Sequence, residues 1–403
     1  MRFDLHLRQD LKTKVDDLAR RMSEWEEKPP LGDEDRRRLR EAIVPFNHTT
    51  SGEDFSVGGV DGTGDFPSVS YADSFVHVAV AQGVLYATDA LSGLREVEAL
   101  APVVEMVWLP EEEARRRKGL DDAFAALAGR PVQDVIATSD YRVLKAKYAR
   151  AAQPVEELEE RLIRPHASDM ANLGIQLRST AELGAALRLI GLRPKYVLVD
   201  GTLSLPLVTR SGESLFFEHL KRLCCVSALE QDVGFLALSK SHGVRSVEML
   251  EELAAEKLGL PPGGRPEHWY LRIPTPEEDG WETPLVEGRT LPPVAAMTYL
   301  VRLHRSTPVL RLDMALAWWR RHLRGTNDVE TRRLEQQLFQ DLDRCSHDQR
   351  CYGYPYPIKA GHDRASLSEP ERVALRKQIV DAAVRAGMKP SLFRSASKAT
   401  RHE

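Results

Sequence analysis

The sequence predicts an α/β protein with a mixed β-sheet, because short apolar runs typical of buried strands alternate with longer charged segments of helical spacing. Two of the apolar runs end alike: Val-Gly-Gly-Val-Asp-Gly-Thr occupies 57–63 and Tyr-Val-Leu-Val-Asp-Gly-Thr occupies 196–202. We expect each to be a short strand that ends on its aspartate and is followed at once by a tight turn. Asp-Gly is common turn chemistry, but two such aspartates on neighbouring strands could also share a divalent metal ion.

The composition is that of an ordinary soluble protein, because 42% of the 403 residues are hydrophobic, 29% are charged and the net charge is −4. The length allows two or three domains, or one large elaborated domain. No apolar stretch approaches the ~20 residues of a membrane-spanning helix, and no signal peptide is expected at the N-terminus. The cysteines form no Cys-x-x-Cys pair, which favours reduced thiols in a cytoplasmic protein. They are Cys224, Cys225, Cys345 and Cys351.

Residues 1–48 are expected to form a helical arm ahead of the first aspartate strand. A helix is predicted at 4–27, with an apolar seam that is too short for a free coiled coil of ~3–4 heptads. The seam consists of Leu11, Val15, Leu18, Met22 and Trp25. We expect it to pack on the rest of the protein or on a second copy of itself. Pro29-Pro30 ends this helix, and a second helix is predicted from Asp33 to Ile43 with Asp33 as its N-cap.

Three further strands are predicted after the first aspartate strand. Residues 74–80 and 84–88 are expected to form a hairpin around Gln82-Gly83, and 103–108 to form the third strand. A strand that carries an aspartate and precedes an antiparallel meander is one recognisable way to begin an α/β nuclease sheet.

A helical region is predicted between this meander and the second aspartate strand. Residues 111–130 and 141–165 are rich in Glu, Arg, Leu and Ala, with helical spacing of the apolar side chains. Another helix is expected from Thr180 to Ile190. Thr180 would cap this helix and Glu182 would lie in its first turn.

The second half of the chain continues this alternation of strands and helices. A buried strand is predicted from Val233 to Ser239, directly followed by Lys240. Further strands are expected at 268–273, 296–303 and 309–312, and helices at 246–258, 313–324, 328–343 and 369–387. Between the last two helices, Tyr354 and Tyr356 are each followed by proline, which predicts a stiff extended segment, with His362 in the loop beyond.

Three carboxylates suit metal-assisted cleavage of a phosphodiester: Asp61, Glu182 and Asp200. Mg²⁺ and Mn²⁺ prefer carboxylate and water oxygens, and two such ions about 3.5–4 Å apart can activate the attacking water and stabilise the leaving oxygen. Glu182 is also open to a simpler interpretation, because a glutamate in the first turn of a helix commonly complements the helix dipole.

Other side chains could assist at the phosphate. Lys240 follows a strand directly and could contact phosphate, or be a solvated strand end. His362 could be a general acid, a metal ligand or a phosphate donor, or have a structural role. Tyr354 and Tyr356 could stack on a base or belong to the core.

The order of these motifs resembles the NurA nucleases, Mn²⁺-dependent DNA end-resection nucleases that work with the hexameric ATPase HerA. The resemblance spans about residues 50–385. The motifs are Asp-Gly-Thr at 61–63, Glu182, Leu-Val-Asp-Gly-Thr-Leu at 198–203, Leu-Ser-Lys-Ser at 238–241 and Gly-Tyr-Pro-Tyr-Pro-Ile-Lys-Ala-Gly-His at 353–362. The family usually has serine after the first Asp-Gly, and Thr63 keeps the hydroxyl here.

The resemblance implies an RNase H-like mixed sheet flanked by helices in 49–403, with a helical insertion at about 111–180, and a homodimer. It also implies the members of the site. Asp61, Glu182 and Asp200 match the carboxylates that hold two Mn²⁺ or Mg²⁺ ions, His362 matches the active-site histidine and is a further candidate ligand, and Lys240 and Tyr354 match further active-site positions.

The implied function is a metal-dependent deoxyribonuclease with 5′–3′ exonuclease and single-strand endonuclease activity. It would act in DNA end resection and double-strand break repair, or in defence against phage. Two alternatives stay open: a catalytically inactive DNA-binding adaptor of a translocase, and an RNase H-like nuclease that acts on RNA or hybrids. The complete set of three carboxylates argues against the adaptor.

The charge of the chain bears on its partners, which are expected to be single-stranded DNA, duplex ends and a HerA-type ATPase. A net charge of −4 gives little long-range attraction to DNA. Local basic runs such as 115–118 could line a channel, although such runs are more often solvated helix faces. The sequence has no Gly-x-x-x-x-Gly-Lys-Ser/Thr loop with which to use ATP itself.

Overall fold

Three Val- and Leu-rich runs form the parallel centre of the sheet. In the computed structural model, β2 (Ser56–Thr63), β7 (Tyr196–Asp200) and β8 (Gly234–Ser239) lie side by side in parallel. Strands of this kind read as continuous apolar runs because both of their faces are covered. The structure describes residues 5–26, 32–49, 52–64, 67–71, 74–89, 93–110, 112–138, 163–166, 170–203, 216–240, 247–261, 263–274 and 296–394.

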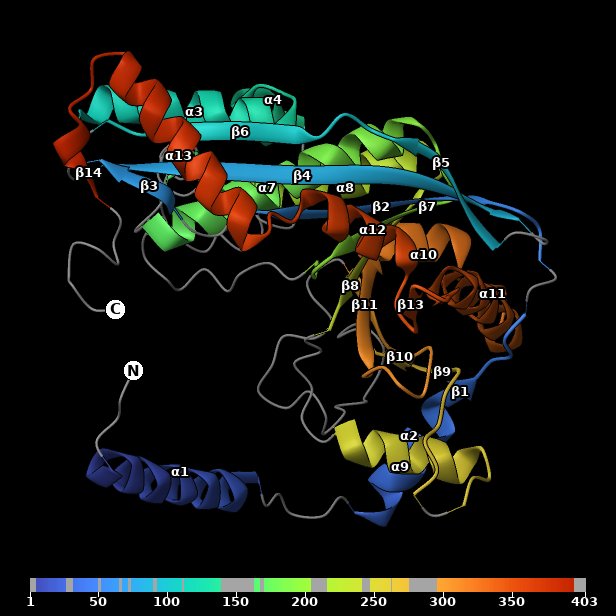
Figure 1. Ribbon diagram of the computed structural model, residues 1–403. Coiled ribbons are helices and arrows are strands. Elements are labelled where there is room, and N and C mark those ends of the chain that lie inside the picture. The colour runs from blue at the N-terminus through green and yellow to red at the C-terminus, as the bar shows by residue number, and fades with distance from the viewer. Residues whose placement is uncertain are drawn as a thin grey trace, which may run out of the picture.

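Antiparallel strands extend the sheet on both sides of this centre (Figure 1). In the ranges that the structure describes, they give a mixed sheet of twelve strands. In sheet order the further strands are β1 (Ile43–Pro45), β9 (Trp269–Ile273), β10 (Ala296–Arg302) and β11 (Leu310–Ala315) before β8, and β4 (Ser74–Asp89), β3 (Pro67–Tyr71) and β14 (Phe393–Arg394) after β2. β5 (Gly93–Ala99) and β6 (Val103–Trp108) pair with β4, and β12 (His347–Asp348) pairs with β13 (Cys351–Tyr352) as a separate hairpin. The predicted α/β class with a mixed sheet is confirmed.

Helices flank this sheet, as the long charged segments predict. They are α1 (Leu5–Glu26), α2 (Asp33–Ala42), α3 (Glu113–Ala128), α4 (Val132–Thr138), α7 (Met170–Gly191), α8 (Phe216–Glu230), α9 (Val247–Lys257), α10 (Leu316–His322), α11 (Asp328–Ser346), α12 (Tyr356–Ala365) and α13 (Glu369–Arg385), with a short 3₁₀ turn at Pro390–Leu392. The helix predicted at 141–165 lies almost wholly outside the described residues.

Successive glycines of β2 show that α7 and α12 cover opposite faces of the sheet. A Cβ on Gly58 would meet Leu189 of α7 at 3.0 Å, whereas a Cβ on Gly59 would lie 2.1 Å from the backbone of Pro357 in α12. Neighbouring residues of a strand point to opposite faces, so the two helices sandwich β2. The missing side chains allow α12 in particular to approach the strand closely.

The predicted hairpin at Gln82-Gly83 is wrong, because this dipeptide lies inside the single 16-residue strand β4. Gln82 is buried, and its Nε2 donates to the carbonyl oxygens of Gly83 and Leu100 at 2.9 and 2.6 Å. A Cβ on Gly83 would meet Leu189 at 3.2 Å, so this glycine makes room for α7. Side-chain hydrogen bonds and packing therefore explain why Gln82 and Gly83 lie inside a strand, although these residue types suggest a turn.

Of three local predictions about the ends of strands and helices, two are wrong and one is confirmed. β2 continues past Asp61 to Thr63, which pairs with Val80, so the first Asp-Gly-Thr forms no turn. The second copy does leave its strand at Asp200, and Gly201 follows with φ of +141°. Asp33 is the first residue of α2, whose N-cap is Gly32.

The N-terminal arm joins the body through its second helix. Leu39 of α2 and Ile43 of β1 are fully buried in a cluster with residues of α9 and β9, and β1 pairs with β9. Figure 1 shows α2 beside α9, with α1 lying apart from the sheet. No helix in the described ranges is long and apolar enough to cross a membrane. The four cysteines are free thiols, and only Cys351 is partly exposed.

Candidate active site

The two aspartates of the repeated motif lie next to each other at one end of the parallel strands. The register pairs Val60 with Val199, so Asp61 and Asp200 occupy the following positions on β2 and β7. The Asp61 side chain is 12% exposed and that of Asp200 is 33% exposed, so both carboxylates sit at the border between core and solvent. The prediction of two aspartates on neighbouring strands is confirmed.

Helix α12 brings His362 onto Asp61. His362 Nδ1 lies 2.9 Å from Asp61 Oδ2, and His362 Nε2 lies 3.1 Å from Ser366 Oγ. The approach depends on Gly361, where a Cβ would meet the Asp61 nitrogen at 3.0 Å. His362 therefore lies on a helix and not in a loop. The extended segment is shorter than predicted, because Tyr356 begins α12 with a proline at the second helical position, which helices tolerate.

Tyr354 and Lys240 lie beside Asp200. Lys240 Nζ is 3.7 Å from Asp200 Oδ2 and 4.6 Å from the centroid of the Tyr354 ring. The Tyr354 side chain is buried, which makes it a part of the site wall and not an exposed platform for a base. Its hydroxyl makes no hydrogen bond of good geometry, yet burial first and then the charges of Asp200 and Asp61 raise its pKa.

Burial also raises the pKa of Asp200, and the negative charge of Asp61 acts in the same direction. The Lys240 ammonium opposes this shift, and the Tyr354 hydroxyl and the Arg178 guanidinium oppose it more weakly. A carboxylate whose charge is disfavoured by burial and by a neighbouring carboxylate is common where a cation binds.

Glu182 reaches the same region from α7. A Cβ on Gly62 would meet Glu182 Cγ at 2.9 Å and Oε1 at 3.0 Å, so this carboxylate lies against the strand one residue after Asp61. α7 begins at Met170, so Glu182 is in the middle of the helix, and Thr180 is a buried residue whose hydroxyl donates to the Gln176 carbonyl. The dipole interpretation of Glu182 is therefore excluded, because that effect is confined to the first turn.

Arg178 is a functional candidate that the sequence analysis missed. Its Nε lies 3.4 Å from Glu182 Oε1, one helical turn earlier on α7, and its charge also acts on Asp200. The i, i+4 spacing of Arg178 and Glu182 was the available signal, but it is common on solvated helix faces. Only the fold brings the pair to the ends of β2 and β7.

The side chains at this end of the sheet offer the oxygen ligands that a hard divalent ion prefers. Asp61, Glu182 and Asp200 offer oxygen ligands, and the buried Tyr354 hydroxyl faces the site with no partner of good geometry. Their ligand atoms do not form a group of three within 4.8 Å of one another. The roles of Asp61, Glu182, Asp200 and His362 as metal ligands therefore stay predictions.

No family model and no curated protein matches the chain. Among solved structures, the NurA nuclease from Sulfolobus solfataricus is 15% identical and has a TM-score of 0.49, with 96% of this chain and 99% of that chain covered. A crystal structure of NurA with manganese is 11% identical and has a TM-score of 0.38, with 95% and 99% covered. A further NurA crystal structure is 10% identical, with a TM-score of 0.40 and the same coverage. The structural neighbours of this chain thus include crystal structures of NurA nucleases.

Proposed function

We propose that this protein is a metal-dependent nuclease with an RNase H-like core that hydrolyses DNA phosphodiester bonds. One observation carries the proposal. Asp61 and Asp200 lie side by side on parallel strands, and His362, Lys240 and Tyr354 all approach this carboxylate pair. A fold alone needs no such gathering of charge, because partly buried carboxylates facing each other are destabilising unless a cation joins them.

Each residue has a distinct role in this proposal. Asp61, Asp200 and Glu182 would hold one or two Mn²⁺ or Mg²⁺ ions, with His362 as a further candidate ligand. When bound, such ions activate water and stabilise the charge on the leaving oxygen. Lys240, whose side chain is 62% exposed beside Asp200, would contact the phosphate. The half-exposed ring of His362 is oriented by Asp61 and would supply a proton to the leaving group.

DNA cleavage is tested with labelled linear DNA, comparing Mn²⁺, Mg²⁺ and EDTA. We expect cleavage with either ion, none with EDTA, and none with Asp200→Asn. Asp363→Asn is the matched control, because this carboxylate is one residue from His362 but pairs with Lys359 on the exposed face of α12. Cleavage by Asp200→Asn at the rate of Asp363→Asn would contradict the proposal.

The nucleic-acid class is tested with a panel of single-stranded DNA, duplex DNA, RNA and RNA–DNA hybrid. We propose cleavage of single-stranded DNA and of duplex ends, with 5′–3′ polarity on the duplex. Exclusive cleavage of RNA or hybrid would redirect the proposal to a ribonuclease. Binding of DNA with no cleavage of any substrate would favour an adaptor of a translocase.

We also propose that a HerA-type hexameric ATPase feeds DNA to this nuclease during end resection, in break repair or in phage defence. The support is the net charge of −4, which gives weak attraction to duplex DNA at physiological salt. The test is digestion of long linear duplex with and without the ATPase encoded in the same genome, each with and without ATP. Equally fast and processive digestion by this chain alone would contradict the partnership.

The exposed seam of α1 supports the proposal of a homodimer. Leu11, Val15, Leu18 and Met22 are 46–61% exposed in the single chain, and such a stripe on one helix commonly packs on a partner helix. Light scattering at micromolar concentration is expected to give a dimer. A monomer would contradict the proposal, whereas a stable dimer after deletion of 1–28 would exclude only the role of α1.

A further inference from the structure

Asp343 differs from most of the buried carboxylates in its partners. Among the described residues, six carboxylates are buried, and four of them contact a lysine or arginine side chain. These four pairs are Glu218–Lys221 at 3.1 Å, Asp313–Arg311 at 2.7 Å, Glu335–Arg272 at 3.6 Å and Asp341–Lys195 at 2.7 Å. Asp343 is 1% exposed, and its ion-pair partners in the described part of the chain are only histidines. Asp61, in the candidate active site, is the other exception.

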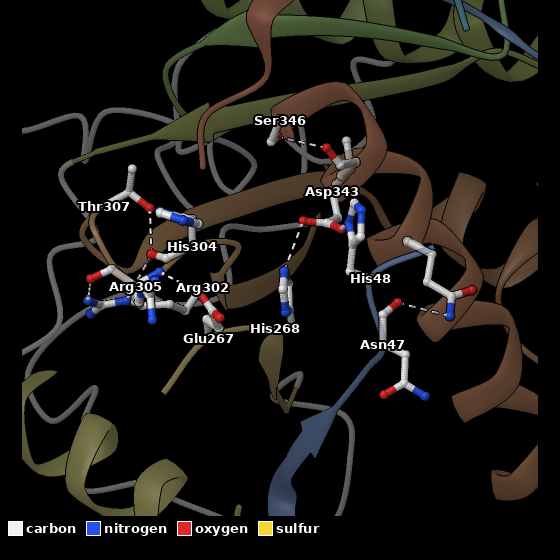
Figure 2. Close-up of polar contacts among 12 residues, drawn as sticks. Asn47, His48, Glu267, His268, Arg302, His304, Arg305, Thr307, Asp343 and Ser346 are labelled. Atoms are coloured by element: carbon white, nitrogen blue, oxygen red, sulfur yellow. Dashed lines mark hydrogen bonds and ion pairs between the residues drawn. The ribbon is translucent and has the colours of Figure 1, made fainter. Parts of the chain in front are cut away.

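The histidines reach Asp343 from distant parts of the chain. His48 Nδ1, just after β1, lies 2.5 Å from Asp343 Oδ2, and His268 Nε2, just before β9, lies 3.3 Å from Asp343 Oδ1. Figure 2 shows both rings turned toward the Asp343 carboxylate. A third ring belongs to His347, whose centroid is 4.2 Å from that of His48. A buried carboxylate is therefore surrounded by nitrogen donors and not by permanent cations.

Local sequence explains why two of these groups lie together at the end of α11. Asp343 and His347 are four residues apart at the C-terminal end of this 19-residue helix, with His347 as its C-cap. Side chains at i and i+4 lie on the same face of a helix, the spacing by which helices present two ligands to one metal ion. The C-terminal end of a helix also carries a partial negative charge that favours a cation.

We propose that His48, Asp343 and His347 form a binding site for a transition-metal ion of the Zn²⁺ class, in addition to the proposed nuclease site. One ligand atom from each residue lies within 4.8 Å of the other two, and this is the only such group among the described residues. Two imidazoles and one carboxylate are typical zinc ligands, with bond lengths of about 2.0–2.2 Å, and leave a fourth position for water. The His48–Asp343 pair would open by roughly 1 Å, because tetrahedral ligands at these lengths lie roughly 3.4 Å apart.

His268 has a different role, because it contacts Asp343 through the other carboxylate oxygen. Its Nε2 faces Oδ1, which leaves Oδ2 for the ion. The contact is an ion pair and not a hydrogen bond of good geometry. Groups that touch a metal ligand in this way orient it and commonly change metal affinity about 10–100-fold when they are removed. Replacement of His268 by Asn is therefore expected to weaken zinc binding without abolishing it.

The ion would join segments that lead to the candidate active site. His347 begins β12, where it pairs with Tyr352 of β13. Gly353 follows, and its nitrogen donates to the Ser346 carbonyl at 2.7 Å, immediately before Tyr354. Binding of a metal at His347 would thus fix the end of α11 and the hairpin that precedes Tyr354. The expected role is to stabilise this connection, because the ion would join the segment after β1 to the end of α11.

The experiment measures zinc in the purified full chain after incubation with ZnCl₂ and desalting. We expect about one zinc per chain, retained in Asp200→Asn, which separates this site from the proposed nuclease site. His347→Asn is the main variant, because this exposed ring is removed with little risk to folding. His48→Asn is the second variant. Both are expected to weaken zinc binding by at least about 10-fold.

His304→Asn is the matched control. This histidine stacks on Tyr352 at 5.6 Å and lies in the same neighbourhood, but it does not belong to the three-residue group. It is expected to retain zinc. Replacement of zinc by Co²⁺ gives a second readout, since its visible absorption reports nitrogen and oxygen ligation. Zinc content far below one per chain in the wild type, or full retention of zinc by both His347→Asn and His48→Asn, would overturn the proposal.

Discussion

Among the described residues, Asp61 and Asp343 are the two buried carboxylates whose ion-pair partners are histidines. The two carboxylate–histidine pairs differ in the groups that surround them. Asp61 has a second carboxylate, Asp200, on the next strand, with Lys240 beside it. Asp343 has further imidazoles around it and no second carboxylate within the group. The surroundings of Asp61 are therefore rich in oxygen ligands, and those of Asp343 are rich in nitrogen ligands.

This difference determines which ion each region favours. Carboxylates and water suit Mg²⁺ and Mn²⁺, whereas imidazoles suit Zn²⁺ and related ions. The mode of support differs as well. Asp61 is on the central sheet and meets a helix that glycines allow to approach closely, whereas Asp343 is at the end of a helix where three chain segments meet. We infer that one pair serves chemistry at the ends of parallel strands and the other serves to hold segments together.

The largest expected effect separates the two pairs by function. Asp61→Asn should reduce DNA cleavage by about 10³-fold, because loss of one metal carboxylate removes several kcal/mol of charge stabilisation in the transition state. His48→Asn should reduce the zinc content instead. Cleavage rate and zinc per chain are measured for both variants. Normal DNA cleavage by Asp61→Asn would contradict the division of roles between the two pairs. Loss of zinc from Asp61→Asn, with zinc retained by His48→Asn, would contradict it as well.

The close approach of α12 to β2 gives the next largest effect. Gly59→Ala should destabilise the protein by about 1–3 kcal/mol and also slow cleavage, because its Cβ would lie 2.1 Å from the Pro357 backbone and would push His362 away from Asp61. Gly58→Ala is the matched control on the other face, where the Cβ meets the end of the flexible Leu189 side chain at 3.0 Å. Urea unfolding and cleavage assays measure both variants. Equal effects from Gly58→Ala and Gly59→Ala would show that the α12 contact is not special.

Sequence reasoning was most successful where local pattern and tertiary role agree. β7 and β8 were predicted within one or two residues, because continuous apolar runs bounded by polar residues indicate parallel strands buried on both faces. The repeated Asp-Gly-Thr motif led to the neighbouring aspartates Asp61 and Asp200. The turn that the motif predicts does not form at Gly62, because pairing with β4 extends β2 to Thr63.

Contacts between distant segments could not be predicted in this way. Gln82 and Gly83 suggested a turn, but partners on Leu100 and Leu189 keep both inside β4. Thr180 suggests an N-cap, which predicts Glu182 at the start of a helix, but the helix begins ten residues earlier at Met170. The histidine cluster has no sequence signal beyond the spacing of Asp343 and His347 at the end of α11, since the pairing of His48 with Asp343 joins segments 295 residues apart.

A smaller effect is expected from Tyr354. Tyr354→Phe should reduce cleavage about 10-fold, because the hydroxyl faces Asp200 and Asp61 and is available to a bound ion or phosphate. Stability should change by less than about 1 kcal/mol, since this buried hydroxyl has no hydrogen bond of good geometry to lose. Cleavage and thermal unfolding are measured on the same preparation. A large loss of stability with normal cleavage would assign Tyr354 to the core.

The smallest effect concerns the pH dependence of stability at Asp200. Burial and the charge of Asp61 raise the pKa of this carboxyl above its ordinary value of 3.8. Between 3.8 and the raised pKa, the folded state therefore binds more protons at this group than the unfolded state does. Folding stability consequently falls as pH rises through that window, and the penalty persists at neutral pH. Asp200→Asn removes the penalty, so the variant should melt at a higher temperature than the wild type at neutral pH.

The advantage of Asp200→Asn should disappear below pH 3.8, where the carboxyl is protonated in both states. Asp343→Asn is the matched comparison, and it should melt at a lower temperature at neutral pH, because the acceptors that face His48 and His268 would be replaced or weakened. Thermal unfolding across pH, with bound metal removed, measures both variants. If the melting temperature rises in Asp200→Asn and falls in Asp343→Asn at neutral pH, Asp200 serves the active site at the expense of stability. Asp343 then stabilises the fold. A lower melting temperature for Asp200→Asn at neutral pH would contradict the penalty assigned to the ionised Asp200 carboxylate.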